Sequence, residues 1–366
     1  MAIDRRTFTL GVAALTINAP AAARAELAGS ARFAANIRER DGSYAAVAYS
    51  SDSGLIRKVS LPDRGHDLTY NGQADLLVAF ARRPGNFAVA FDVARRSPPI
   101  RFTTPANRHF YGHGVFSSDG RLLYATENDF ENGAGIIGVY DCAAGFKRIG
   151  EHSSFGIGPH DLNILDDGHT LVIANGGIAT HPEFGRKPLN LATMRASLVY
   201  IDGRTGELIE RHELTDARRK LSIRHLDVGA DDRVVIGCQF KGAKSQQVEL
   251  IGFHQRGRDL VFLPPKPDVA RALRHYVSSI AIDRDGGVAG FTSSRGEQVV
   301  LVDIRNRSVL GIRRFPDVSG IAGGLSRGFV LTGGHGDVGF CDVQSPVSRM
   351  SREPWSWDNH AISLDE

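Results

Sequence analysis

Five of the thirteen histidines in this chain occupy one equivalent position of an internal repeat. The first two intervals between them are 47 residues each, and the third is 65 because one loop is longer. Neutral imidazole binds iron, copper, zinc and nickel, so histidines that converge from separate strands can form a metal site. The pattern therefore predicts a metal or anion site if the fold brings these side chains together: His66, His113, His160, His225 and His360.

Short strands must position these histidines. Each repeat contains four short apolar runs separated by turns such as Asn71-Gly72 and Asp119-Gly120, pairs that suit tight hairpins. A repeat of strands near 47 residues indicates a β-propeller, in which equivalent positions of the innermost strands surround a central channel. The next two repeats carry Ser279 and Gly320 at this position, so the predicted ring is open on one side.

The ends of the chain are expected to complete the ring of blades. Six repeats begin at the positions of His66, His113, His160, His225, Ser279 and Gly320. Residues 44–61 supply a second, third and fourth strand, and residues 359–364 supply the missing first strand. We therefore predict an all-β, seven-bladed propeller over residues 40–366, closed by a blade that both termini share and preceded by a linker over 26–39.

Aspartates follow several of the ring histidines. Asp67, Asp161 and Asp227 lie one or two residues after a ring histidine. Each can accept the second imidazole N–H of a nearby histidine and thereby fix its tautomer. The alternative is that the histidines line a wet channel mouth and bind only water, or that the repeat reuses one residue type for structural reasons.

The loops between second and third strands are expected on the same face as the ring. They are rich in basic groups, which favour carboxylate or phosphate ligands, and an anionic metal chelate over the ring is one interpretation. Loop charge that is merely solvated is the other. The loop over 176–197 is long enough to cover the channel mouth. The candidate ligand-binding residues are Arg82, Arg83, Glu127, Asp129, His181, Arg186, Lys187, Arg195, Lys241, Arg295 and His335.

The N-terminus has the pattern of an export signal. Arg5-Arg6 precede an apolar run that is too short to span a bilayer, and Ala23-Arg24-Ala25 is a cleavage pattern. We predict a twin-arginine signal peptide over 1–25 and a monomer in the periplasm without a membrane anchor. After cleavage 41 basic and 40 acidic residues remain, and no basic stripe carries interleaved aromatics, so nucleic acid is not expected as a partner.

The cysteines and short motifs exclude several kinds of chemistry. Cys142, Cys238 and Cys341 are odd in number and far apart, which is poor material for a disulfide framework. The chain contains no C-x-x-C-H motif for covalent haem and no G-x-S-x-G or H-E-x-x-H motif. The acidic run 127–131 lacks the spacing of a known calcium loop.

Several phrases of the chain resemble one bacterial family. They are His-Gly-Val-Phe over 113–116, Leu-Tyr-Ala-Thr-Glu-Asn-Asp over 123–129, Gly-Pro-His-Asp-Leu over 158–162 and Ala-Asn-Gly-Gly over 174–177. The chain is similar to the twin-arginine-exported propellers catalogued as domain of unknown function 1513. Members lie in gene clusters with imelysin-like periplasmic proteins and other iron-uptake components. The resemblance implies a role in periplasmic iron acquisition, and it brings no established catalytic residues.

Three functions are consistent with these features. The first is a protein that binds a metal, with iron favoured over copper or zinc, or an anionic metal complex, at the histidine ring. The second is a redox or hydrolytic metalloenzyme that uses the same ring, with Glu127, Asp129 or His335 as general acid or base. The third is an interaction scaffold for periplasmic iron-uptake proteins. Tight metal binding without turnover would favour the first, and redox activity or hydrolysis that is lost on His113→Ala would favour the second. Full function in a variant that lacks all five ring histidines would favour the third.

Overall fold

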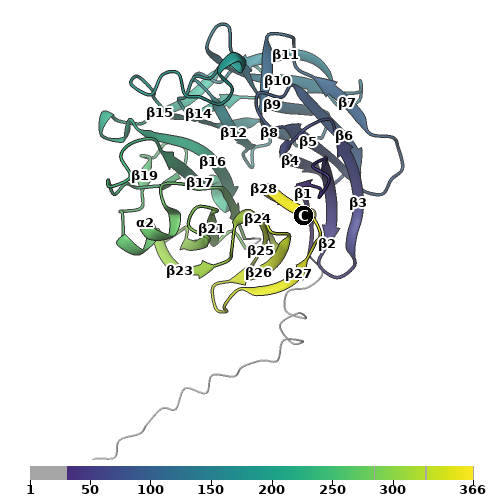
Figure 1. Ribbon diagram of the computed structural model, residues 1–366. Helices are drawn as coiled ribbons and strands as arrows, with labels where there is room; N and C mark the ends of the chain where they lie inside the picture. Colours follow the sequence, from purple (N-terminus) through teal and green to yellow (C-terminus); the bar gives the residue numbers. More distant parts are fainter. Residues whose placement is uncertain (1–30, 284, 326–327, 366) are drawn as a thin grey trace, which may run out of the picture.

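Seven four-stranded antiparallel sheets surround a central axis in the computed structural model (Figure 1). The structure describes residues 31–283, 285–325 and 328–365. The prediction of a seven-bladed all-β propeller is therefore confirmed. The predicted signal peptide over 1–25 lies outside the described residues.

Each blade runs from the axis outward through four consecutive positions. The innermost strands are β28 (Ser356–Ser363), β4 (Gly65–Asn71), β8 (Arg108–Phe116), β12 (Pro159–Ile164), β16 (Leu221–Gly229), β20 (Ser279–Ile282) and β24 (Val318–Leu325). The second strands are β1 (Arg32–Arg38), β5 (Leu76–Ala81), β9 (Leu122–Asp129), β13 (Thr170–Asn175), β17 (Arg233–Phe240), β21 (Val288–Ser293) and β25 (Gly328–Gly333).

The third strand of each blade is mostly buried, and the outermost strand is the most exposed of the four. The third strands are β2 (Tyr44–Ser50), β6 (Phe87–Asp92), β10 (Ala134–Asp141), β14 (Ser197–Asp202), β18 (Ile251–His254), β22 (Gln298–Asp303) and β26 (Asp337–Asp342). The outermost strands are β3 (Gly54–Leu61), β7 (Ile100–Thr103), β11 (Lys147–Ser153), β15 (Leu208–Glu213), β19 (Val261–Phe262), β23 (Ser308–Arg314) and β27 (Ser348–Arg352).

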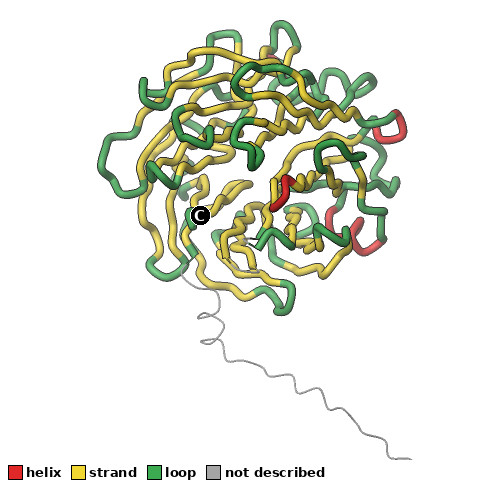
Figure 2. Tube along the Cα trace, turned by 180° about the vertical axis from the view of Figure 1, so that it is seen from behind, coloured by secondary structure: helices red, strands yellow, loops and turns green. Residues whose placement is uncertain are grey.

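Helical structure is confined to the connections between strands (Figure 2). It comprises α2 (Pro267–Leu273) and the 3-10 turns η1 (Pro182–Phe184), η2 (Asp216–Arg218) and η3 (Ala230–Asp232). No described helix is both long and apolar enough to cross a lipid bilayer.

The two ends of the chain share one blade, as predicted, but the division of its strands needs a correction. The C-terminal β28 is the innermost strand and pairs with β1, not with a strand that begins at Tyr44. The expected linker over 26–39 therefore contains the second strand of the blade, in which Phe33, Ala35 and Ile37 are buried. Five of the seven residues of β1 are alanine, asparagine or arginine, so its apolar alternation is too weak to be recognised as a strand from the sequence.

Buried apolar side chains fill the space between neighbouring blades. Phe80 of β5, for example, packs edge-on against Phe110 of the next blade, with ring centroids 5.5 Å apart. This inter-blade core holds each innermost strand at a constant distance from the axis. Equivalent positions on those strands therefore meet at the centre of the molecule.

Candidate metal centre

The five ring histidines all lie on innermost strands, at or beside an irregularity in strand pairing. The register of β4, β8, β12, β16 and β28 shifts at the ring position. A β-bulge adds a residue without a partner and re-aims the neighbouring side chains. In β8 the bulge contains Gly112, whose φ of +111° favours glycine, and a Cβ there would lie 2.4 Å from Cδ2 of His66. The bulges thus let the imidazoles crowd together at the axis.

The imidazoles form one cluster with His113 at its centre. The ring centroid of His113 lies 4.9 to 5.6 Å from the centroids of the other four histidines. Two groups of three have ligand atoms within 4.8 Å of one another. They are His66, His113 and His160, and His113, His225 and His360.

His113 is the one histidine of the cluster that two carboxylates approach. Its Nδ1 lies 2.8 Å from Oδ2 of Asp67 and 3.2 Å from Oδ1 of Asp161. Burial alone would lower the pKa of His113, but Asp161 and Asp67 together raise it to about 10. Without a metal, His113 is therefore a protonated imidazolium at neutral pH, paired with these carboxylates. A metal ion at Nε2 would displace the Nε2 proton, while the carboxylates hold the proton on Nδ1.

The other four histidines are held in the neutral form. Burial, reinforced by neighbouring positive groups, lowers the pKa of His66, His160 and His225 well below the usual value. Burial also lowers the pKa of His360, to about 4. Nδ1 of His66, His160 and His225 and Nε2 of His360 are buried without a hydrogen-bond partner among the described residues. Neutral imidazoles with unused ring nitrogens are suited to metal binding.

The two repeats without a histidine also meet the cluster. The Ser279 hydroxyl lies 3.0 Å from Nδ1 of His360. Gly320 packs against the backbone of His360, since a Cβ at Gly320 would lie 3.1 Å from its carbonyl carbon and 2.2 Å from the Thr332 hydroxyl. The assignment of both residues to the ring position agrees with this geometry.

A cavity of about 600 Å³ leads to the cluster from one face of the disc. His113, His225 and His360 line its inner end, whereas the hairpin turns after β4 and β8 line its outer end. Four aspartates line it (Asp67, Asp161, Asp227 and Asp365), and no lysine or arginine does among the described residues. The cavity is therefore an acidic channel.

This position of the cavity corrects the expected location of the ring. We predicted a histidine ring on the channel mouth, below the loops that join second and third strands. The histidines are instead 1 to 7 % exposed, and none of those loops contributes to the cavity among the residues that the structure describes. The ring position is the second residue of β4 and β12 and lies at or past the middle of β8, β16 and β28. In each of these strands the residues after the histidine line a channel that opens on the far face.

Two of the three predicted supporting aspartates also join neighbouring blades. Asp161 accepts a hydrogen bond from the Leu226 N–H of the next blade, and Asp227 accepts one from the Ile282 N–H of the blade after that. Asp161 lies beside His113 and His225, but Asp227 contacts no ring histidine in the described part of the chain. Burial raises the pKa of Asp227 to about 7.

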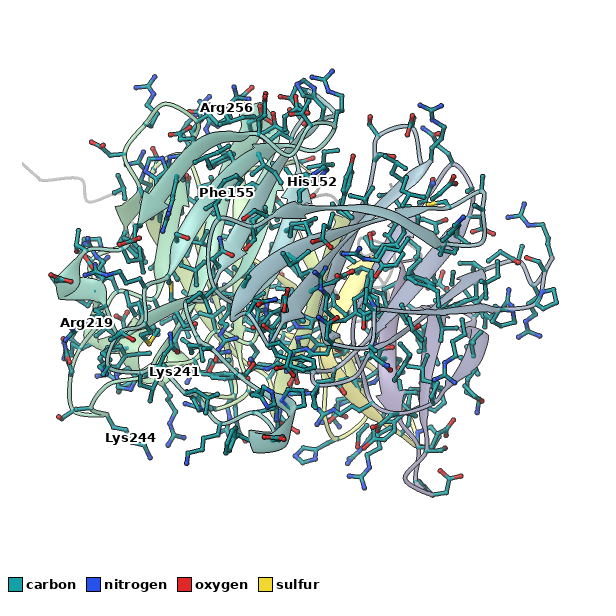
Figure 3. The ribbon with its side chains drawn as sticks, turned by 90° about the horizontal axis from the view of Figure 1, so that it is seen from above. His152, Phe155, Arg219, Lys241, Lys244 and Arg256 are labelled. Atoms are coloured by element: carbon teal, nitrogen blue, oxygen red, sulfur yellow. The ribbon has the colours of Figure 1, made fainter. Side chains whose placement is uncertain are left out.

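On the opposite side of the cluster lie four of the predicted basic residues. Arg82 pairs with Asp358, with 3.3 Å between Nη1 and Oδ1. The guanidinium of Arg83 lies 5.9 Å from the ring centroid of Tyr111, and that of Arg295 lies 4.3 Å from the Tyr276 ring. The fourth is Lys241; Figure 3 shows it with Lys244 on one face of the disc, opposite Arg256.

The remaining predicted ligand-binding residues serve other contacts. Glu127 is fully buried and accepts a hydrogen bond from the Tyr140 hydroxyl, 2.6 Å away, and from Arg148, while Asp129 accepts hydrogen bonds from Asn132. His181 packs on Phe130, and Arg195 pairs with Glu213 and Asp216. Arg186, Lys187 and His335 are exposed. None of these contacts involves a ring histidine.

Arg224 belongs to this site and was not predicted. It precedes His225 in the bulge of β16 and is only 3 % exposed. Burial, with repulsion from Arg83, lowers the pKa of Arg224 to about 9. Its place next to a ring histidine in the sequence was a usable signal, but an arginine there is ordinarily assumed to be solvated.

Comparisons with known proteins support the fold and identify the family. No curated protein matches the chain. Hydrazine synthase of Kuenenia stuttgartiensis is similar in structure, with a TM-score of 0.59 and 12 % identity over 90 % of this chain and 96 % of that chain. A crystal structure of the mitotic checkpoint complex contains a chain with a TM-score of 0.59 and 10 % identity, over 81 % of this chain and 80 % of that chain.

Identities this low establish a shared fold and nothing about activity. The family comparison is more specific, because the model described as "Protein of unknown function (DUF1513)" matches residues 59–364. That range includes all five ring histidines. The chain therefore belongs to the DUF1513 family of proteins of unknown function.

Proposed function

We propose that this protein is a periplasmic metal-binding propeller that holds a transition-metal ion at the histidine cluster. The observation that carries the proposal is a set of buried imidazole nitrogens at the inner end of an acidic channel, which have no hydrogen-bond partner in the described part of the chain. Desolvating this many polar atoms is unfavourable unless something binds them. A metal ion satisfies them together.

His113, His225 and His360 are the ligands that we assign to the ion. All three line the channel, and their ligand atoms lie within 4.8 Å of one another. Nε2 of His113 points away from the carboxylates and has no partner among the described residues. His66 and His160 pack behind this group and complete the alternative set that shares His113.

The acidic channel favours a metal cation over an anionic chelate as the entering species. Among the described residues the channel has four aspartates and no balancing lysine or arginine, and such a lining attracts cations and repels anions. Imidazole ligands suit iron, copper and zinc, and oxygen from water or carboxylate would favour iron among these. We assign iron, in keeping with a role in periplasmic iron acquisition beside imelysin-like proteins.

The test is elemental analysis of protein that has been exported to the periplasm. We expect iron at close to one equivalent in the wild type, and none in a folded His225→Ala/His360→Ala variant. The exposed His335→Ala is the matched control and should retain the metal. Copper or zinc in place of iron would overturn the metal assignment alone. No metal in the wild type, even after incubation with each ion, would overturn the proposal.

A metalloenzyme is the second candidate, and the size of the channel favours it. A volume of about 600 Å³ exceeds what one ion requires and accommodates a small substrate next to the three channel histidines. Turnover of a redox or hydrolytic probe by the metal-loaded protein, abolished by His225→Ala, would establish this function. Tight metal binding without turnover would support the first candidate, a metal-binding protein without catalytic activity.

A further inference from the structure

The side of the cluster away from the channel carries an excess of positive charge, of which Arg224 is buried, Arg83 and Lys241 are half-buried and Arg295 is exposed. Six basic residues lie there besides the exposed Arg186, and the electrostatic effects of Arg83 reach Arg224 and Lys241. The six are Arg64, Arg82, Arg83, Arg224, Lys241 and Arg295. Asp358 is the single carboxylate with which any of them pairs among the described residues, and Arg64 and Arg82 both use it.

The other four cations have no acidic partner in the described part of the chain. Nε of Arg224 and Nη1 of Arg83 are buried and make no hydrogen bond there. The Lys241 ammonium donates only to the side-chain oxygen of Gln239, at 3.1 Å. A buried charge without a partner is strongly unfavourable, so such groups are retained mainly where something neutralises them.

The pKa values of two of these basic groups are lowered, which is consistent with the lack of a neutralising partner. Burial, with repulsion from Arg224, Arg295 and Arg83, lowers the pKa of Lys241 to about 7. Burial and repulsion from Arg186 lower the pKa of Arg83, although the Tyr111 ring partly offsets this. An anion between these groups would relieve both effects.

We propose that Arg83, Arg224 and Lys241 form a binding site for a multiply charged oxyanion, of the phosphate or polycarboxylate class. Guanidinium forks bind such oxygens in pairs, and an ammonium adds a third point of charge. Arg83 and Lys241 are half-buried, so solvent reaches the site at these two residues. The tyrosines Tyr111 and Tyr276, which pack against Arg83 and Arg295, form its aromatic wall.

This site is separate from the proposed metal function and does not depend on it. Arg224 precedes His225 by one residue, whereas the acidic channel begins at residues that follow the histidine. The anion therefore sits on the opposite side of the imidazoles from the entry path of the cation. Its test uses metal-free protein, so that failure of either proposal leaves the other intact.

The test is titration calorimetry of the metal-free mature protein with inorganic phosphate and, separately, with citrate. Sodium chloride at matched ionic strength is the control for general screening. We expect saturable heat with one or both oxyanions and none with chloride. Arg224→Met and Lys241→Met should each weaken binding at least about tenfold, because each removes a charge-assisted contact. Arg121→Met, an exposed arginine on the channel face, should bind as the wild type does.

The two arms also distinguish the sources of the oxyanion. A preference for phosphate assigns a phosphate-bearing ligand, and a preference for citrate assigns a polycarboxylate. Thermal unfolding in the same buffers is the second readout, since a ligand of the native state raises Tm. The proposal is overturned if neither oxyanion gives heat or raises Tm, or if Arg224→Met and Lys241→Met both respond as the wild type does.

Discussion

The two sides of the histidine cluster differ in charge. Towards the channel, four aspartates line a cavity without a balancing lysine or arginine among the described residues. On the far side, Arg83, Arg224 and Lys241 are buried or half-buried without an acidic partner in the described chain. A cation can approach the imidazoles from the first side and is repelled on the second, whereas an anion experiences the reverse.

The order of residues along one innermost strand explains this difference. These strands run nearly along the axis, so a residue before the histidine lies on one side of the cluster and a residue after it lies on the other. In β16, Arg224 precedes His225 and Asp227 follows it. In this strand a basic, an imidazole and an acidic group therefore lie one after another along the axis.

The largest expected effect is a loss of stability when His113, which lies between two aspartates on the acidic side, is replaced. His113→Leu leaves Asp67 and Asp161 without their shared imidazole, and unpaired buried charge costs about 3–5 kcal/mol of unfolding free energy. Urea denaturation of the metal-free variant measures this loss, with exposed His335→Leu as control. A loss below about 1 kcal/mol, as at ordinary surface positions, would show that the two carboxylates do not depend on His113.

The next effect tests the bulge that lets the imidazoles crowd together. Gly112→Ala introduces a Cβ against the His66 ring and requires a φ of +111°. Gly133→Ala requires a φ of +64°, which alanine adopts at lower cost than +111°, and has nothing within 4 Å. The two variants therefore differ both in the clash and in backbone strain. We expect Gly112→Ala to cost about 2 kcal/mol more than Gly133→Ala in thermal unfolding. Equal losses would mean that His66 moves aside freely and that the backbone at residue 112 relaxes.

A smaller effect is expected for metal affinity on the acidic side. Asp67→Asn removes a carboxylate beside Nδ1 of His113 without changing its shape, and the loss of such a partner weakens metal binding about tenfold or more. Competition with a chromophoric chelator measures the dissociation constant. Asp119→Asn, on an exposed turn, supplies the comparison. An unchanged metal affinity in Asp67→Asn would show that this carboxylate does not support the metal site.

The smallest effect has the opposite sign and tests the basic side. Arg224→Met replaces an unpaired buried cation by an apolar side chain of similar length. We expect a gain of about 1 kcal/mol in unfolding free energy, measured in chloride buffer without oxyanions. Arg121→Met controls for the general loss of one positive charge. A loss of stability in Arg224→Met would show that the Arg224 guanidinium stabilises the fold and is not an unpaired, destabilising charge.

Much of the fold followed from the repeat, and part of the site did as well. The spacing of histidines predicted seven blades and the convergence of His66, His113, His160, His225 and His360 at the axis. It placed the open face wrongly, because strand direction alone does not say which end of the channel the side chains close. It also selected Glu127 and Asp129, whose carboxylates prove to be used within their own blade. Loop position is a poor guide to the direction in which a side chain points.

The sequence by itself determined the blade count, the shared terminal blade and the alignment of five imidazoles, because these depend only on repeat length and on position within the repeat. Tertiary structure decided which groups surround those imidazoles. The bulges of β8 and β16 re-aim neighbouring side chains, and the contact of His113 with Asp67 and Asp161 joins three different blades. The charge that each histidine experiences therefore depends on distances between blades, which no local pattern specifies.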